Sequence, residues 1–171
     1  MTTKTQSFLA NFPWIALVLL FGGTLLLYSP SFTHDFTNFD DDAYVTENTA
    51  LAEGLTPAAI QWSLTAVHSS NWHPLTWMSH GLDITWFGLN PAGHHGVNVI
   101  LHSFSAVLLF LFLRQATKLH WPSFIVAALF AWHPLHVESV AWIAERKDIL
   151  STLLAWATFI AYGTYTRKPG I

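Results

Sequence analysis

Four apolar runs constrain this chain more than any other feature of its sequence. They cover residues 12–28, 97–113, 121–133 and 149–165. A helix rises 1.5 Å per residue, so the longer runs come close to crossing a hydrocarbon core about 30 Å thick. The composition agrees, because 52% of the 171 residues are hydrophobic and only 10% are charged, against about a quarter in soluble domains. The sequence therefore predicts an all-α membrane protein with about four transmembrane helices.

The first apolar run is interpreted as a retained helix and not as a cleaved signal peptide. A signal peptide would end in an A-x-A-like cleavage site. After Tyr28 the chain reads Ser29-Pro30-Ser31, which is a poor substitute for such a site. The run is therefore expected to remain as the first membrane helix.

The basic residues predict which side of the membrane each loop occupies. Five of them fall on one side of a four-helix weave: Lys4, Arg114, Lys118, Arg167 and Lys168. Cytoplasmic loops carry an excess of Lys and Arg, so this side is cytoplasmic. Residues 1–11, 114–120 and 166–171 are then cytoplasmic, and residues 29–96 and 134–148 lie on the other side.

The long non-cytoplasmic loop is expected to carry short helices that lie on the membrane surface. Thr56 as N-cap with Pro57 at the first helical position is a sound helix start. A second surface helix is predicted over 75–87, after Pro74 has blocked helix continuation at His73. Asn90 and Pro91 then supply another N-cap and first-position pair.

Three consecutive carboxylates, Asp40, Asp41 and Asp42, form the most charged point of this loop. Adjacent carboxylates repel each other, so one gains from sharing a proton, a cation or a hydrogen-bond donor. The triplet is therefore either a solvated turn or an acid–base site. Whether a divalent cation binds at Asp40 and Asp41 stays open. No other metal site is predicted.

Arg146 and Lys147 are the two basic residues on the wrong side of the membrane. One interpretation is neutralisation by the flanking Glu145 and Asp148. The other is that the two cations hold an anion, such as a lipid phosphate.

Three further classes of protein can be weighed against the sequence. Ten His suggest a metal or haem protein, but Pro134 breaks the helical spacing between His133 and His136, and no H-E-x-x-H pattern occurs. The absence of Cys excludes thiolate ligands. Nucleic-acid binding requires clustered positive charge, yet residues 5–113 contain no Lys or Arg, so nucleic acid is not expected as a partner. A non-catalytic membrane scaffold remains an alternative.

Four motifs in this order carry a more specific resemblance. They are Phe39 to Asp42, Trp72-His73-Pro74-Leu75-Thr76, Leu89 to His95, and His133 to Asp148. Together they resemble the N-terminal membrane region of bacterial tetratricopeptide-repeat membrane proteins, which are related to the transmembrane and tetratricopeptide-repeat O-mannosyltransferases of the GT-C superfamily. The resemblance covers residues 12–165, and it implies a GT-C-like fold of which this chain is a fragment.

The resemblance also implies an activity and a site. The family transfers a sugar from a polyprenyl-phosphate donor to a hydroxyl, here of a protein Ser or Thr, and an acidic pair in its first non-cytoplasmic loop serves as the catalytic base. That pair corresponds to Asp40 and Asp41, with Asp42 as an extra acid. We expect Arg146 and Lys147 to hold the donor phosphate. The remaining residues expected to line the site are Trp72, His73 and Glu138. The location implied is a bacterial inner membrane, among membrane lipids, with the acidic loop facing the periplasm.

Overall fold

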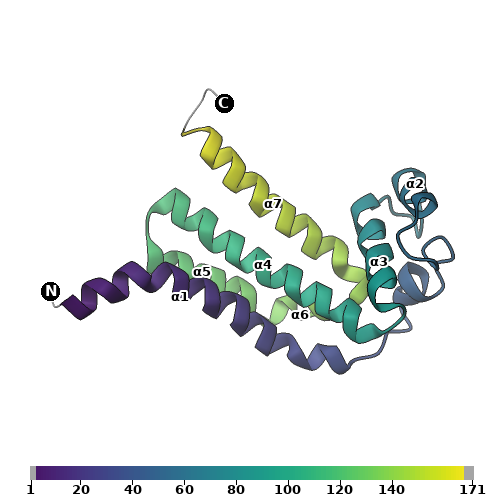
Figure 1. The fold of residues 1–171 in the computed structure, drawn as a ribbon, viewed down its shortest axis with the longest axis horizontal. Coiled ribbons are helices and arrows are strands. Elements are labelled where there is room, and N and C mark those ends of the chain that lie inside the picture. The colour runs from purple at the N-terminus through teal and green to yellow at the C-terminus, as the bar shows by residue number, and fades with distance from the viewer. Residues whose placement is uncertain (1–2, 168–171) are drawn as a thin grey trace. The chain divides into compact units, whose positions relative to one another are not determined.

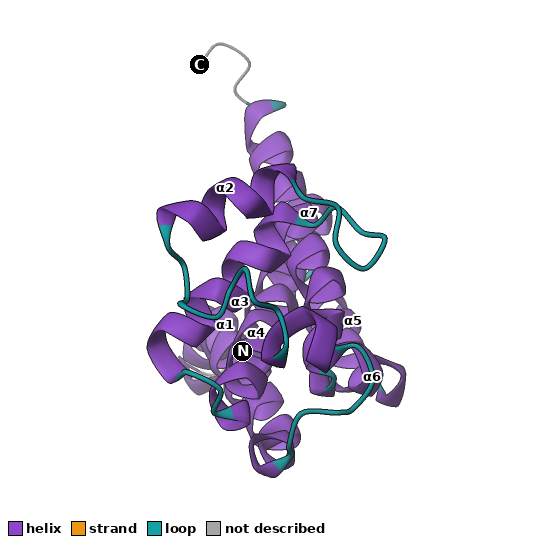
Figure 2. Ribbon diagram, turned by 90° about the vertical axis from the view of Figure 1, so that its right-hand side faces the viewer, coloured by secondary structure: helices purple, strands orange, loops and turns teal. Residues whose placement is uncertain are grey.

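The computed structural model describes residues 3–167, and the regular secondary structure in that part of the chain is helical (Figures 1 and 2). The helices are α1 (Thr3–Tyr28), α2 (Pro57–Thr65), α3 (Pro74–Phe87), α4 (Pro91–Thr117), α5 (His120–Trp132), α6 (Val137–Ala141) and α7 (Arg146–Tyr165). Short 3-10 and π-helical turns join several of them. The prediction of an all-α fold is confirmed.

Local sequence signals set where several helices begin. The Thr56 hydroxyl accepts the backbone N–H of Ala59 at 3.1 Å, and Pro57 occupies the first position of α2. Proline suits this position because its missing N–H would have no partner there anyway. Asn90 likewise accepts the N–H of Ala92 at 3.2 Å before α4. The predicted helix starts are confirmed at these positions.

Within residues 3–167, two helical segments are long and apolar enough to cross a membrane, Pro13–Thr33 and Pro91–Thr117. A third span is formed if His120–Trp132 and Pro134–Ala141, which meet at a bend of 48°, count as one. The fourth expected span corresponds to α7. It is helical but less apolar, because it begins with Arg146, Lys147 and Asp148.

The chain divides into two compact units. Within the described residues, the first unit contains 3–27, 100–136 and 151–167, and the second contains 28–99 and 137–150. The core of the first unit combines small and large side chains: Ala16, Leu20, Leu109, Phe110, Ala127 and Ala128. Small residues let membrane helices approach closely. At Gly23 a side chain would lie 2.9 Å from the Trp132 ring, whose Nε1 donates to the Thr24 hydroxyl.

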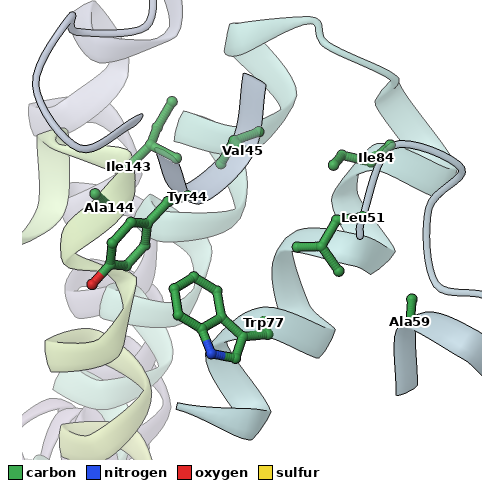
Figure 3. Close-up of a cluster of buried hydrophobic side chains, with 8 residues drawn as sticks. All are labelled: Tyr44, Val45, Leu51, Ala59, Trp77, Ile84, Ile143 and Ala144. Carbon is green, nitrogen blue, oxygen red and sulfur yellow. The ribbon is translucent and has the colours of Figure 1, made fainter. Parts of the chain in front are cut away.

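The second unit has its own hydrophobic core, which supports the acidic segment (Figure 3). Its buried members are Tyr44, Val45, Leu51, Ala59, Trp77, Ile84, Ile143 and Ala144. Trp77 is fully buried, and its ring centroid lies 4.6 Å from that of Tyr44. Aromatic pairs at this separation add to the free energy gained by burial. The turn that follows the acidic triplet is thus fixed to α3.

Candidate functional site

Asp41 is the buried member of the acidic triplet. Its Oδ2 accepts the Thr37 backbone N–H at 2.9 Å and the Thr37 hydroxyl at 3.0 Å. Its Oδ1 accepts the backbone N–H of Ala144 at 2.9 Å. The carboxylate therefore ties its loop to the 3-10 turn Ile143–Glu145. A cation bound jointly by Asp40 and Asp41 would have to compete with these donors.

Asp40 differs from its neighbour in exposure and in backbone conformation. Its side chain is exposed, and its φ of 62° lies in the left-handed region. A non-glycine residue there is held at a cost of about 1–3 kcal/mol, and such strain is concentrated at functional sites. Asp42 is half-buried, and its Oδ1 accepts the N–H of Ala43 at 2.7 Å at the start of the π-helical turn Asp42–Thr46. The three carboxylates thus have three different environments.

Trp142 holds the residue that precedes the triplet. Its Nε1 donates to the carbonyl oxygen of Phe39 at 3.2 Å, and the two rings lie 5.5 Å apart. Phe39 directly precedes Asp40 in the chain, and Asp41 directly follows Asp40. The strained Asp40 is therefore anchored on both sides by residues 142–144. The sequence analysis did not single out Trp142 as part of the site.

Lys147 and Tyr44 lie together in this unit. Lys147 Nζ donates to Glu145 Oε1 at 2.6 Å and lies 5.8 Å from the centre of the Tyr44 ring. Burial lowers the pKa of Lys147, but the hydrogen bond and charge of Glu145 outweigh that effect and raise the pKa overall. Burial raises the pKa of Tyr44; Lys147 opposes this and Asp40 adds to it. Lys147 is therefore a protonated, partly exposed cation beside the ring of Tyr44.

Arg146 lies in the interior and not at the surface. Its side chain is fully buried. The guanidinium donates through Nε to Asn98 Oδ1 at 2.7 Å and through Nη2 to the carbonyl oxygen of His94 at 2.9 Å. Nη1 donates to the Ser79 hydroxyl at 3.0 Å and forms an ion pair with Asp83 Oδ2.

This geometry differs from both sequence-based interpretations of Arg146. A buried guanidinium whose three nitrogens all have protein acceptors has no exposed N–H to offer a donor phosphate. The neutralising carboxylate is that of Asp83, 63 residues away, and not that of Glu145 or Asp148. Glu145 instead pairs with Lys147. The sequence could not indicate this, because the Asp83 partner is distant along the chain.

Asp83 also belongs to a buried group that includes His80 and His94. These are the residues, among those the structure describes, whose ligand atoms lie close enough to hold a metal ion, all within 4.8 Å of one another. His94 Nδ1 lies 3.5 Å from Asp83 Oδ2. His and Asp are ligands that suit Zn²⁺. However, Arg146 already neutralises Asp83, and a divalent ion there would face a second buried cation.

Burial changes the proton affinities in this group. Burial raises the pKa of Asp83 from 3.8 to about 6, even though Arg146 lowers it. Burial, followed by the positive charge of Arg146, lowers the pKa of His80 well below its ordinary value. The two ring nitrogens of His80 are buried without a hydrogen-bond partner. Asp83, Asn98 and His80 were missed in the sequence analysis; an Asp inside a largely apolar and aromatic helix was the available signal.

The other predicted site residues have different surroundings. Trp72 is 59% exposed, and its Nε1 donates to the Leu64 carbonyl oxygen at 3.1 Å. The His73 ring centroid lies 6.2 Å from that of Trp77. Glu138 is exposed in the first turn of α6. His73, residues 142–144 and Lys147 thus lie against Tyr44 and Trp77, while Arg146 is directed inward.

Comparison with known proteins relates the chain to animal O-mannosyl-transferases. It is 33% identical over 159 residues to "Protein O-mannosyl-transferase TMTC1" of Mus musculus, covering 86% of this chain and 16% of that protein. It is 28% identical over 173 residues to "Protein O-mannosyl-transferase TMTC4" of Homo sapiens, covering 88% of this chain and 23% of that protein. For "Protein O-mannosyl-transferase TMTC2" of Mus musculus the identity is 32% over 148 residues, covering 81% and 17% respectively.

The chain therefore spans between 16% and 23% of the length of these curated relatives. No family model matches the chain, and no solved structure matches it either. The resemblance to the O-mannosyltransferases is confirmed, whereas the bacterial origin stays a prediction.

Proposed function

This chain is related to the TMTC protein O-mannosyl-transferases, and from that relationship we propose that it is part of a membrane glycosyltransferase that acts on proteins. The donor is a polyprenyl-phosphate sugar, and the acceptor is a Ser or Thr hydroxyl. The acidic loop, residues 29–96, faces away from the cytoplasm. Its position opposite most of the basic residues supports this orientation.

The reaction requires a base and a cation from the protein. The acceptor hydroxyl gives up its proton to a carboxylate as its oxygen attacks the anomeric carbon. The bond between that carbon and the phosphate oxygen breaks, and the phosphate leaves with the electron pair. A cation near the leaving phosphate stabilises the charge that develops there.

We assign the base to Asp40. The observation that carries this assignment is that Asp40 is exposed on a strained backbone, while the oxygens of Asp41 are engaged by Thr37 and Ala144. A base must reach the acceptor hydroxyl, which favours the exposed carboxylate. Asp41 then acts as a positioning residue that holds the Asp40 backbone in place. Asp42 lies at the edge of the site.

We assign the phosphate contact to Lys147. It is partly exposed and charged, and it lies beside Tyr44, whose pKa is influenced by both Lys147 and Asp40. Arg146 supports this contact indirectly, because its buried ion pair fixes the first turn of α7, from which Lys147 projects. The exposed ring of Trp72 is suited to stack on a sugar face. His73 and Glu138 complete the surroundings of the site.

The test compares carboxylate variants in the full-length protein. The measurement is transfer of labelled sugar from a polyprenyl-phosphate donor to an acceptor peptide. Asp40→Asn keeps the shape of the side chain but removes the proton acceptor, so we expect a loss of about 100- to 10,000-fold in rate with little change in melting temperature. Asp42→Asn is the matched control and should retain most of the activity. Wild-type turnover by Asp40→Asn would overturn the assignment.

A further inference from the structure

The charged residues divide unequally between the two compact units. The sequence of the first unit, residues 1–27, 100–136 and 151–171, contains no Asp or Glu. All ten acids therefore belong to the second unit. Of the seven basic residues, Arg146 and Lys147 lie in the second unit, which leaves five in the first. The first unit thus has basic side chains and no acidic side chain of its own to balance them.

Three of these five cations line one pocket of about 400 Å³. Its full lining is Leu111, Arg114, Gln115, Lys118, His120 and Arg167. These residues come from the end of α4, the start of α5 and the segment after α7. Arg167 reaches the end of α4 by donating to the carbonyl oxygen of Gln115. Gln115 in turn donates to the Thr164 hydroxyl at 3.2 Å.

Local dipoles cannot balance three cations at this point. The C-terminal end of a helix carries about half a negative elementary charge, and the ends of α4 and α7 contribute to this pocket. Together the two helix ends contribute about one negative elementary charge, which is less than the three positive charges of Arg114, Lys118 and Arg167. Because the unit contains no Asp or Glu, the pocket is suited to an anion from outside it.

The position of the pocket indicates what kind of anion this is. It lies at the end of α4, which is one of the two long apolar helices, and Leu111 supplies an apolar wall. Trp121, Tyr162 and Tyr165 are large exposed aromatic residues near the same helix ends. Trp and Tyr collect at the membrane–water interface, at the level of the lipid headgroups.

We propose that this basic pocket binds the phosphate of an anionic glycerophospholipid. Arg114 and Arg167 provide planar guanidinium groups that suit phosphate oxygens, and Lys118 adds a point charge. Leu111 lies against the apolar part of the lipid. Basic pockets between membrane helices bind anionic headgroups in this way. The lining residues of this pocket belong to the first unit, whereas the residues assigned to sugar transfer belong to the second.

The test uses the full-length protein in detergent with added lipid. Native mass spectrometry would measure retention of phosphatidylglycerol against phosphatidylcholine, whose choline neutralises the headgroup. We expect preferential retention of phosphatidylglycerol and a higher melting temperature in its presence. Arg114→Gln combined with Arg167→Gln should weaken phosphatidylglycerol binding about tenfold or more, since each loses a charge-assisted hydrogen bond. The matched variants Arg114→Lys and Arg167→Lys keep the charge but not the planar guanidinium, so they should lose less of the binding than the Gln variants.

Three results would overturn the proposal. Equal retention of the two phospholipids would show that the negative charge of the headgroup does not contribute to binding. Displacement of the lipid by millimolar inorganic phosphate would identify a site for soluble anions. Preferential displacement by a polyprenyl phosphate would assign the pocket to the sugar donor. The rate of sugar transfer by Asp40→Asn, whether lost or retained, bears on none of these readouts, so the two proposals can fail independently.

Discussion

The carboxylate of Asp41 accepts the backbone N–H of Ala144 at 2.9 Å, although 103 residues separate the two in the chain. This contact joins the acidic loop to the segment that carries Glu145, Arg146 and Lys147. It fixes the two most charged motifs of the sequence relative to each other. It also explains why one acid of the triplet is buried while the preceding one is exposed.

Asp41 should therefore matter for stability as well as for activity. Asp41→Ala removes the acceptor of the buried Ala144 N–H and of two Thr37 donors, so we expect a loss of about 3 kcal/mol or more in the free energy of unfolding. Thermal unfolding in detergent measures this loss. Asp42→Ala is the control and should cost about 1 kcal/mol, because one hydrogen bond is lost at a half-exposed site. Equal melting temperatures for the two variants would contradict the structural role of Asp41.

Substitution of Arg146 should mainly lower stability, whereas substitution of Lys147 should mainly lower the affinity for the donor. Arg146→Gln leaves Asp83 as an uncompensated buried charge, so we expect a loss of about 3–5 kcal/mol in stability. Lys147→Gln breaks a partly exposed ion pair worth about 0–1 kcal/mol, and it should instead weaken binding of the polyprenyl-phosphate donor. Melting temperature and donor affinity, measured on the same preparations, test both expectations. If Arg146→Gln melts like the wild type, the buried ion pair is not a stabilising element.

Local signals in the sequence were sufficient to predict much of the helical structure. Thr56 with Pro57, and Asn90 with Pro91, act on the backbone within a few residues, so the start of a helix can be recognised without knowing what it packs against. The bend at His133 and Pro134 is of the same kind. The all-α class followed from the long apolar runs.

The candidate site could be predicted only in part, because its decisive contacts are distant along the chain. The triplet and the segment 142–147 were recognised separately, but nothing in either indicates that Asp41 bonds to Ala144. Arg146 illustrates the same difficulty: its charged neighbours Glu145 and Asp148 are nearest in sequence, yet Asp83 is nearest in space. Which of two adjacent acids is exposed depends on this tertiary packing.

The proposed orientation in the membrane can be tested with single cysteines, because the natural sequence contains none. Ser31 is buried and therefore unsuitable, whereas Ser70 and Thr117 are exposed. A cysteine at Ser70 should react with a membrane-impermeant thiol reagent added from outside the cytoplasm, and a cysteine at Thr117 should react only after the membrane is permeabilised. The reverse pattern of labelling would invert the topology.

His80 should make stability depend on pH. Burial, followed by the charges of Arg146 and His94, lowers the pKa of His80 well below its ordinary 6.5. Below pH 6.5 the unfolded chain therefore binds a proton that the folded chain does not, so this residue lowers stability as the pH falls and has no effect above that range.

His80→Phe removes this titration. Between pH 6.5 and 5 the stability of the variant should fall less steeply than that of the wild type, by about 1.4 kcal/mol per pH unit when one proton is involved. Denaturant unfolding at several pH values measures the difference in slope. Asp83 acts in the opposite direction, because burial raises its pKa to about 6, so Asp83→Asn serves as the comparison and should steepen the fall. Identical slopes for the wild type and His80→Phe would show that His80 takes up its proton in the folded state.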